Sequence, residues 1–387
     1  MFNTSNFYQT LYENHWVSNV YDVTGYFDKT IAQKLIVQDI TFKGTQIYSY
    51  QLFPTYLNYN VHLLKDFRLK KVKQKIGFAI YLKQYKTVYD YFKGECSTQH
   101  RKNIIRATNR LESSFNITYK TYFGDMLIDH YTFIMHRLKD MIANRFQQRE
   151  GRNKTLNNWK HYVDQTLDLI KKKKASIFVI YNENKPIEIS INYHIDSMMY
   201  SSISSYDLDY GKFSLGNIEI YKQLEWCMLN NICFFDMGYG DFEYKRKWSN
   251  HIYDFEDHIF YHKFNLIGNC YTLLKAYIYK LINYLIENNI NDKIYNLLDK
   301  FKKPKQTIDY LDYELITLTS LPNEINKFEK INLNNDVYRF LRQPVYDYLY
   351  KYQEHINNIC LYENSNSDNL YIIQGKNSLV ELKMNRF

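Results

Sequence analysis

The sequence of 387 residues is poor in cysteine, and its five cysteines lie far apart. No two of them have the spacing of a metal-ligand pair or of a disulfide framework, which favours reduced thiols in a cytoplasmic protein. Cys227 and Cys233 fall in apolar segments and are interpreted as core thiols rather than nucleophiles. His251, His258 and His262 lie near one another in the sequence, but no carboxylate is positioned to join them as a metal ligand. No metal is therefore expected.

Long hydrophobic runs and a secretion signal are also lacking. The first residues, MFNTSNFYQTLYENHW, contain no basic region followed by an apolar one, so no signal peptide is expected. The most apolar stretch, 270–286, is interrupted by Lys275 and Lys280 and is shorter than the ~20 apolar residues that a membrane span requires. It is interpreted as an amphipathic helix, and no transmembrane segment is expected.

Glycine (12) and proline (5) are scarce, whereas tyrosine (40) and phenylalanine (24) are abundant. We interpret this bias first as a genomic preference for certain codons, with aromatic surfaces for sugars or bases as the alternative. Hydrophobic residues make up 45% and charged residues 24%, which is typical of a globular chain. The net charge of +9 suits a polyanionic ligand, nucleic acid or an anionic membrane surface, but the lysines lie in scattered patches, typical of solvated faces.

The hydrophobic pattern predicts a mixed α+β chain. Residues 1 to about 75 contain short alternating segments typical of strands, and 76 to about 115 are expected to be helical. A strand at 117–124 precedes two helices, in 126–147 and 155–173.

The second half is expected to begin with an antiparallel meander of three strands at 175–207. Pro304 marks a boundary after the elements of this unit, and the last residues of the chain resemble a hairpin across QGKN. The elements expected in between are a helix at 216–230, strands at 232–237 and 252–264, and helices at 270–290 and 292–302.

The order of meander, loop and helix places Gly216 at a helix start. The first turn of a helix offers up to about four backbone N–H groups without internal partners, together with the positive end of the helix dipole. Such a helix start is a natural anion-binding site, and phosphate groups are the ligands it usually binds. Gly216 lets a ligand approach the backbone, and Ser214 is placed to cap the helix or contact an oxygen. The alternative is an ordinary helix entry.

The next predicted strand leads into DMGYGDFEYKRKW, residues 236–248. Asp236 stands at the end of the apolar run, and Asp241, Glu243 and Lys245 crowd the following loop. Opposite charges at this density tune each other's pKa, as acid–base sites require. The alternative is a solvated turn with surface salt bridges of little energetic weight.

These segments resemble the GNAT-like acetyltransferase family associated with bacterial cellulose and other polysaccharide biosynthesis (CelD-like). Members show a YD…Y…SPG loop, a helix and then FDxGxGxxxYKxxW. The stretch 204–248 carries this order, with Leu215 in place of the usual proline, and RKNIIRATNRLE upstream is similar to the family's Arg-Lys-Asn-x-x-Arg helix. The resemblance covers about 95–270. The matching positions in the stretch are Tyr206, Asp207, Tyr210, Ser214, Gly216, Asp236, Gly238, Gly240, Tyr244, Lys245 and Trp248.

The resemblance implies an α+β, GNAT-like mixed sheet flanked by helices, in which the fourth and fifth strands splay apart to hold acyl-CoA. The chain then divides into a diverged, strand-rich N-terminal GNAT-like half (1–75), a GNAT-like acyltransferase core (76–303) and a C-terminal appendix of unknown role (304–387). The pantetheine would pair with the fourth strand and the pyrophosphate would rest on the loop that follows. The cofactor-binding residues are then Ile203, Ser204, Phe213, Ser214, Leu215, Gly216 and Asn217.

The implied chemistry is direct acyl transfer, with Asp236 as the candidate base and Glu243 behind it. Tyr244 would protonate the leaving thiolate, and Lys245 would hold an anionic acceptor. For Asp236 the alternative is a structural role, in which it fixes the turn or pairs with Arg246. The substrate-binding candidates are Arg101, Arg106, Asp207 and Asp241.

The expected function is therefore acyl-CoA-dependent N- or O-acyl transfer to an amino sugar or polysaccharide precursor in the bacterial cytoplasm. Acetyl-CoA or another acyl-CoA would be the co-substrate, and no DNA partner is expected. Two alternatives stay open. The first is a Fem-like transferase that takes aminoacyl-tRNA, for which the charge of +9 would matter. The second is a catalytically silent GNAT-like module in polysaccharide assembly.

Overall fold

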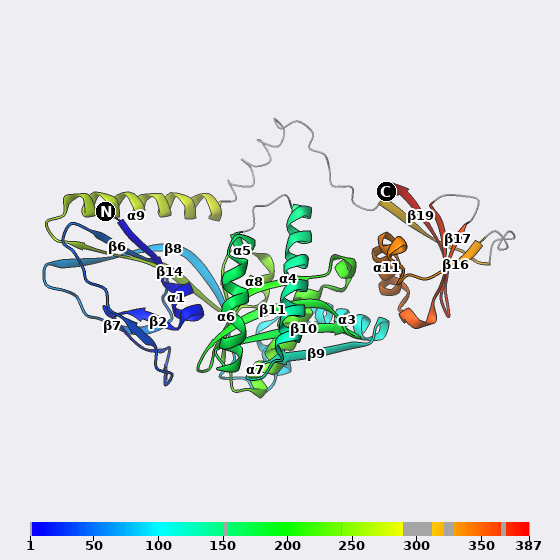
Figure 1. Ribbon diagram of the computed structural model, residues 1–387, viewed down its shortest axis with the longest axis horizontal. Helices are drawn as coiled ribbons and strands as arrows, with labels where there is room; N and C mark the ends of the chain where they lie inside the picture. Colours follow the sequence, from blue (N-terminus) through cyan, green and yellow to red (C-terminus); the bar gives the residue numbers. More distant parts are fainter. Residues whose placement is uncertain are drawn as a thin grey trace, which may run out of the picture.

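The computed structural model describes residues 2–149, 154–240, 242–288, 312–320, 328–364 and 369–386. A nine-stranded mixed sheet runs through its first two thirds (Figure 1). From one edge to the other, its strands are β1 (Phe2–Asn6), β6 (Ile47–Pro54), β14 (His251–His262), β8 (Phe67–Tyr81), β13 (Phe234–Tyr239), β12 (Met198–Tyr206), β11 (Lys185–Ile195), β10 (Ala175–Asn182) and β9 (Ile117–Tyr122).

The predicted meander is confirmed, because β10 pairs antiparallel with β11 and β11 pairs antiparallel with β12. Side chains alternate across these strands: Ile177 belongs to the core under one face of the sheet and Phe178 to the core under the other. The helices predicted beside the meander are confirmed as α4 (Ile128–Arg149) and α6 (Trp159–Lys171), which cover the first face with the short α5 (Lys154–Asn157), and α7 (Leu215–Leu229), which covers the second with α3 (Thr98–Ser114).

Strand β8 lies between β13 and β14 and pairs antiparallel with both. The expectation that residues 76–115 are helical is wrong for its first part, because 76–81 belong to β8 and helix begins only at α2 (Val88–Glu95). Phe78 and Ile80 pack on one face of the sheet while Ala79 packs on the other. A strand buried on both faces gives an apolar run without alternation, which cannot be told from a buried helix by its period. The expected division between residues 75 and 76 falls inside this strand.

The N-terminal region is not made of strands alone, because α1 (Phe7–Asn14) packs under the main sheet. The Asn6 side chain caps α1 by accepting a hydrogen bond from the Gln9 N–H (3.1 Å). Two small sheets complete the region. They consist of β2 (Trp16–Ser18) with β5 (Ile36–Gln38), and of β3 (Tyr21–Tyr26) with β4 (Lys29–Thr30) and β7 (Leu57–Val61).

Helix α9 (Leu266–Glu287) follows β14 and lies along the N-terminal part of the main sheet (Figure 1). It confirms the helix expected at 270–290, whereas the helix expected at 292–302 and the boundary at Pro304 lie outside the described residues. No helix in the described part of the chain has the length and apolar character needed to cross a membrane.

The C-terminal residues form a five-stranded antiparallel sheet with helix α11 (Arg342–Tyr352), and the hairpin expected across QGKN is confirmed by the pairing of Gln374 with Leu379. Aromatic contacts join this unit to the central one, since Tyr346 packs against Phe115 (ring centroids 4.9 Å apart) and Tyr210 (4.7 Å). The strands, in order across the sheet, are β15 (Asp312–Thr317), β19 (Leu379–Arg386), β18 (Leu370–Gln374), β17 (Cys360–Asn364) and β16 (Phe328–Ile331).

Candidate active site

Strands β12 and β13 are parallel neighbours for three residue pairs only, from Met198 opposite Phe234 to Tyr200 opposite Asp236. Beyond this point β12 continues to Tyr206 along β11. Strand β13 stays beside β8 instead, and after a register shift its Tyr239 pairs with Gly77. Gly238 lies in the register shift at the turn and has a φ of +67°, a left-handed conformation that a residue with a side chain rarely adopts. The sheet therefore opens into a gap after Tyr200 and Asp236.

A cleft of about 490 Å³ begins in this gap. One wall is the part of β12 beyond Tyr200, whose edge toward β13 is unpaired. The opposite wall is β13 with the helix α8 (Glu243–Trp248) that follows it. The start of α7 closes one end, and Arg145 reaches in from α4. The lining residues are Arg145, Ser201, Ser202, Ser204, Tyr206, Gly211, Ser214, Leu215, Gly216, Asn217, Glu219, Ile220, Phe235, Met237, Tyr244 and Lys245.

The N-terminus of α7 forms the polar end of the cleft. Ser214 precedes the helix in a left-handed conformation (φ 56°), and its side chain makes no capping hydrogen bond. The Asn217 N–H bonds to the Ser214 carbonyl (2.9 Å), whereas the N–H groups of Leu215 and Gly216 lie in the first turn, where a helix has no internal acceptor. A Cβ on Gly216 would meet no atom within 4 Å, so the backbone there faces open space. This is the geometry of an anion site.

Trp248 ties the end of the DMGYGDFEYKRKW segment to this loop. Its indole N–H donates to Asn217 Oδ1 (3.0 Å), and its ring is fully buried beside Phe92. The tryptophan therefore fixes the orientation of the first turn of α7. This contact gives a physical reason for the spacing between the two segments that carry the resemblance.

Lys245 is buried in the wall of the cleft, where it bonds to the backbone of β13. Its Nζ donates to the carbonyl oxygens of Met237 and Tyr239, both at 2.6 Å. Burial lowers the pKa of Lys245 to about 8, against an opposing effect of the Asp236 charge. Both donated bonds go to the end of β13 that has left β12. Lys245 therefore stabilises the open form of the gap, in a different position from the acceptor contact expected of it.

Asp236 lies on the opposite face of β13 from the cleft. Phe235 and Met237 line the cleft, so the residue between them points through the sheet to the other side. Its fully buried carboxylate accepts hydrogen bonds from the Tyr253 hydroxyl (2.7 Å), the Tyr56 hydroxyl (2.9 Å) and the Gly238 N–H (2.8 Å). Burial raises the pKa of Asp236, although these donors act in the opposite direction.

A second hollow, of about 360 Å³, lies beside Tyr56 and Tyr253, whose side chains are themselves buried. It combines residues of the N-terminal region, among them Phe27 and Asn58, with His251 at the start of β14. The two tyrosines thus contact the hollow and, through their hydroxyl groups, Asp236. The Asp236 carboxyl therefore lies where the strands part, and its hydrogen bonds connect it to the two tyrosines beside the hollow.

Glu219 forms part of the floor of the cleft beside the start of α7, and Glu188 is fully buried next to it. The Ser204 hydroxyl lies within hydrogen-bonding distance of Glu219 (2.8 Å) and Glu188 (3.3 Å), and Gln223 also donates to Glu219 (2.7 Å). Burial raises the pKa of both carboxyl groups, and the charge of Glu219 adds to the rise at Glu188. Arg145 acts to lower the pKa of both. The pair therefore holds a proton more readily than an exposed pair, which keeps the floor compatible with an anionic ligand.

The described residues contain no group of three or more His, Cys, Asp or Glu side chains that could hold a metal ion. All five cysteines are free. The polar groups of the cleft are thus backbone N–H groups, hydroxyls, carboxyls and the cations of Arg145 and Lys245.

A comparison with protein families matches this part of the chain. Residues 98–246 match the acetyltransferase (GNAT) domain family. The match covers less than half of the chain, but it includes β12, α7, β13 and most of α8, which build the cleft. Together with the large mixed sheet and its parted strands, it confirms the α+β, GNAT-like fold predicted from the sequence.

Comparisons with solved structures find similarity only at low identity. FemX is 8% identical with a TM-score of 0.37, over 51% of this chain and 63% of FemX. L-PGS from Bacillus licheniformis is 12% identical with a TM-score of 0.35, over 60% of this chain and 72% of L-PGS. A tandem GNAT protein from the clavulanic acid biosynthesis pathway is 5% identical with a TM-score of 0.30, over 55% of this chain and 63% of that protein. No curated protein sequence matches the chain.

Several predicted site residues of the GNAT domain lie at the cleft. Ser204, Ser214, Leu215, Gly216 and Asn217 line it as expected of cofactor-binding residues, and Tyr244 lines it beside Lys245. Ile203 and Phe213 do not line the cleft but are buried in the two cores, because their side chains point to the opposite side of the strand or into the contact with the C-terminal unit. Their roles as ligand contacts through side chains are not supported.

The remaining predicted residues lie away from the cleft. Glu243 is exposed and pairs with Lys247 (2.7 Å), one helical turn along α8. On α3, Arg101 is half-buried and Arg106 is exposed, and they bond to Thr98 and Asn103 of the same helix. Asp207 pairs with Lys185 (2.7 Å) and Arg137 (3.4 Å), and so anchors the loop before α7. Asp241 lies outside the described residues.

Sequence reasoning missed Arg145 and Glu219 in the cleft, and Glu188, Tyr56 and Tyr253 buried behind it. A signal exists for Glu188, which is a charged residue within the apolar run PIEISINY of a strand predicted to be buried. No local pattern distinguishes Arg145 from the other cations of α4. It is the meeting of distant elements that brings these residues together.

Proposed function

We propose that the protein is an acyl-CoA-dependent acyltransferase that acts on an amino or hydroxyl group of an amino sugar or polysaccharide precursor. The observation that carries this proposal is the parting of β12 and β13 beside the N-terminus of α7, within a segment that matches the GNAT domain. The parted strands offer an extended backbone edge, and the helix offers an anion site at one end of that edge. An extended donor with a diphosphate group has this shape and charge.

The donor would bind along the free edge of β12. Its diphosphate would accept hydrogen bonds from the N–H groups of Leu215 and Gly216 and face the cation of Arg145. Its amide-containing arm would run along residues 201–206, which β13 does not pair with. This direction brings the thioester toward the closed end of the gap, between Tyr200 and Asp236. A backbone N–H of β12 there would polarise the thioester oxygen.

The acceptor would approach from the other face of the sheet, through the hollow lined by Tyr56 and Tyr253. As its nitrogen or oxygen attacks the thioester carbon, its proton would pass to a tyrosine hydroxyl, whose own proton would pass to the Asp236 carboxylate. The carbon–sulfur bond then breaks and the thiolate leaves. Tyr244 is placed to protonate it, because this tyrosine lines the cleft beside Lys245.

Isothermal titration with acetyl-CoA tests the proposal against its two alternatives. We expect acetyl-CoA to bind with one site per chain, and Arg145→Ala to weaken this binding about tenfold or more, because a charge-assisted contact to the diphosphate is lost. Lys139→Ala, on an exposed turn of the same helix, is the matched control and should bind as the wild type does. Absence of acetyl-CoA binding together with a salt-dependent gel shift of tRNA would favour an aminoacyl-tRNA donor. Absence of both would favour a silent module.

Gly216→Ala provides a steric test of the anion site. The added methyl group meets no protein atom, and alanine is favoured over glycine in a helix, so the free energy of unfolding should stay equal or rise by about 0.5–1 kcal/mol. The methyl group stands in the space in front of the first turn, so the Kd of acetyl-CoA should rise about tenfold. Gly44→Ala is the control, because its Cβ would make only an ordinary contact with His262, at 3.6 Å, far from the cleft. Equal affinity of both variants would show that the diphosphate does not lie on this turn.

A further inference from the structure

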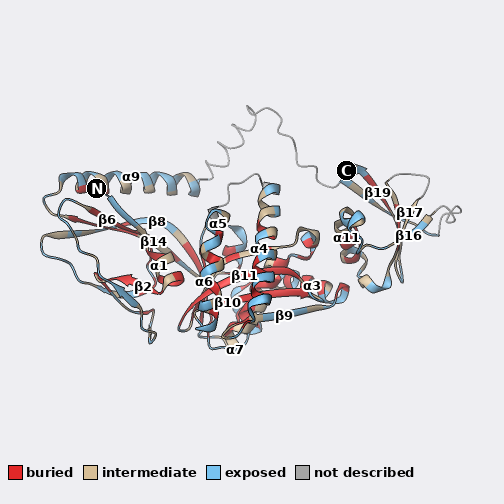
Figure 2. Ribbon diagram, in the orientation of Figure 1, coloured by how far each residue is buried: buried red, intermediate tan, exposed pale blue. Residues whose placement is uncertain are grey.

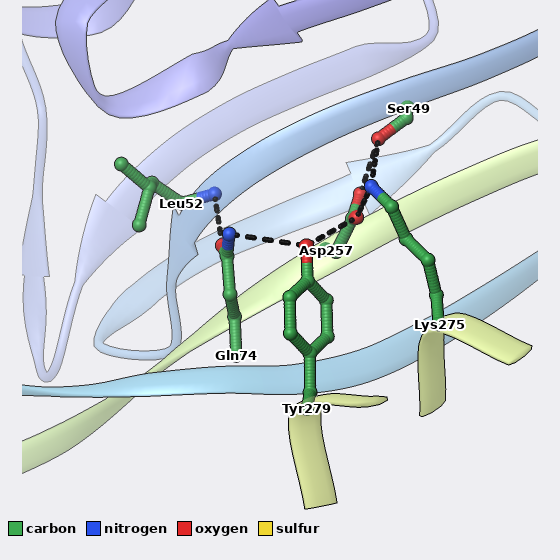
Figure 3. A network of polar contacts seen from close by, with 6 residues as sticks. All are labelled: Ser49, Leu52, Gln74, Asp257, Lys275 and Tyr279. Atoms are coloured by element: carbon green, nitrogen blue, oxygen red, sulfur yellow. Dashed lines mark hydrogen bonds and ion pairs between the residues drawn. The ribbon is translucent and has the colours of Figure 1, made fainter. Parts of the chain in front are cut away.

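Helix α9 attaches to the main sheet through polar side chains. Lys275 Nζ donates to Asp257 Oδ2 (2.7 Å) and lies 3.4 Å from the Ser49 hydroxyl, and the Tyr279 hydroxyl also contacts Asp257 (3.3 Å). The carboxylate of Asp257 is fully buried between the helix and the sheet. Figure 3 shows these groups converging from the helix and from the strands on which it packs.

Gln74 of β8 extends the same network. Its amide nitrogen donates to the Tyr279 hydroxyl (3.2 Å), and its amide oxygen accepts from the Leu52 N–H (3.0 Å), so its side chain links the helix to the backbone of β6 (Figure 3). Removing either partner of a buried ion pair is strongly destabilising, since it leaves a buried charge without compensation. The network therefore fixes which side of α9 faces the protein.

The outward side of α9 is apolar. Leu266, Leu273, Leu274, Tyr277, Leu281 and Tyr284 recur at spacings that place them on one stripe, and their exposed fractions range from 46% to 76%. Figure 2 shows pale blue, exposed residues recurring along the helix, with tan, partly buried residues between them. A surface helix of a globular protein normally turns its apolar stripe toward the core. The apolar stripe of α9 faces away from the protein instead. An exposed apolar stripe of this length is typical of an interaction surface.

Most of the charged residues around this stripe are basic, although the last residue of the helix, Glu287, is acidic. The segment 266–286 contains Lys275 and Lys280 and no acidic residue, and Lys280 is exposed beside the stripe. The neighbouring segment of β8 between residues 68 and 75 has five exposed basic residues and no acidic one. They are Arg68, Lys70, Lys71, Lys73 and Lys75, of which Lys71 lies over the Tyr59 ring (5.0 Å) on the face of the sheet away from α9.

A groove of about 670 Å³ lies between the C-terminal half of α9 and β8. Ile76, Ile282 and Ile286 make part of it apolar, while Lys73 and Lys75 line it with cations. The Lys73 ammonium is held by Asp254 (2.9 Å), and that of Lys75 lies over the Tyr239 ring (4.3 Å). Apolar and cationic groups thus occur side by side along the same edge of the molecule.

We propose that α9 and the basic strip of β8 dock on the surface of an anionic lipid bilayer. A bilayer surface accepts an apolar helix stripe to a depth of about 5–10 Å and meets the flanking cations with its negative headgroups. A second copy of the chain is a poorer match, because the basic residues of the two copies would face and repel one another. The inference goes beyond the proposed function and does not depend on it.

Co-sedimentation with lipid vesicles tests the proposal. The full chain should bind vesicles that contain equal parts of phosphatidylglycerol and phosphatidylcholine, and should bind phosphatidylcholine vesicles far less. Binding to the anionic vesicles should weaken as salt is added, since part of the attraction is electrostatic. Wild-type protein that fails to bind the anionic vesicles would overturn the proposal.

The variant Leu274→Ser/Tyr277→Ser/Leu281→Ser removes the middle of the stripe without touching the polar network, and should lower the partition coefficient at least about tenfold. Its matched control, Leu127→Ser/Ile128→Ser/Phe133→Ser, removes three other exposed apolar side chains at the start of α4 and should bind as the wild type does. Lys280→Glu is a second, independent variant, which should weaken binding to anionic vesicles several-fold. Unchanged binding of both α9 variants would contradict the proposal. So would a wild-type dimer in analytical ultracentrifugation that the triple α9 variant converts to monomer, because the stripe would then be an interface between copies.

Discussion

Asp236→Asn is expected to lower the rate of acyl transfer by about 100-fold or more, a loss typical of removing a general base. Asparagine has nearly the same shape as aspartate, and its carbonyl oxygen can still accept a hydrogen bond from Tyr253 or Tyr56. The neutral amide cannot take up the proton that these tyrosines would pass on. Because Asp236 lies on the face of β13 opposite the cleft, the Kd of acyl-CoA should stay within about a factor of two. Steady-state kinetics and isothermal titration on the same preparation separate the two effects.

The pH profile distinguishes a base from a residue that only holds the turn. A base must be ionised, and burial raises the pKa of Asp236, so kcat/KM of the wild type should rise with pH through that raised value. This limb should be missing from the residual activity of Asp236→Asn. Tyr253→Phe keeps the carboxylate but removes one hydroxyl from the path, so it should show an intermediate loss. Full turnover of Asp236→Asn would assign the residue a structural role.

The raised pKa also predicts an effect on stability that does not depend on activity. Between the ordinary pKa of an aspartate and the raised value in the folded protein, the folded state binds more protons than the unfolded state. The contribution of Asp236 to the free energy of unfolding therefore falls as pH rises through this window, whereas asparagine contributes no such change. Urea unfolding across the window should show the wild type losing stability relative to Asp236→Asn.

The sequence predicted the elements whose patterns are local. The meander at 175–207 has strands bounded by clear turns, and α7 has an apolar stripe, so both were predicted with nearly correct bounds. The candidate anion site at Ser214–Asn217 was predicted because a glycine at a helix start leaves backbone N–H groups accessible to a ligand. The same reasoning failed at 76–81, where a strand buried on both faces has no alternation.

The side chains that complete the candidate site depend on tertiary structure. The strand containing Asp236 was predicted, but the face on which Asp236 lies follows from its pairing with Tyr200 and Ala79, which the local pattern does not contain. A change of one residue in register would have exchanged the two faces. Tyr56 comes from a part of the chain where the resemblance to known transferases is weakest. Its contact with Asp236 requires β8, a strand of the N-terminal region, to enter the sheet beside β13.

Lys245→Met is expected to lower the free energy of unfolding at pH 7 by about 2–4 kcal/mol, because it leaves the carbonyl groups of Met237 and Tyr239 without their buried donor. Methionine keeps the length and the apolar part of the lysine side chain, so the loss reports the two hydrogen bonds rather than a cavity. Without this donor the end of β13 is free to move toward β12, so the cleft should narrow. We therefore expect the Kd of acyl-CoA to rise about tenfold as well. The control is Lys247→Met on the exposed side of the same helix, where the ion pair with Glu243 contributes at most about 1 kcal/mol.

The size of this destabilisation should depend on pH, because burial lowers the pKa of Lys245 to about 8. Between about 8 and the ordinary lysine value of about 10.4, the unfolded state binds more protons than the folded state, so the wild type gains stability as pH rises. Methionine shows no such gain. The difference between wild type and Lys245→Met should therefore widen by about 3 kcal/mol between pH 7 and pH 10.5, as a shift of one pKa unit corresponds to about 1.4 kcal/mol. Urea unfolding of both proteins at the two pH values measures this difference directly. A constant difference would show that the Lys245 ammonium is hydrated, and the gap between β12 and β13 would then need another support.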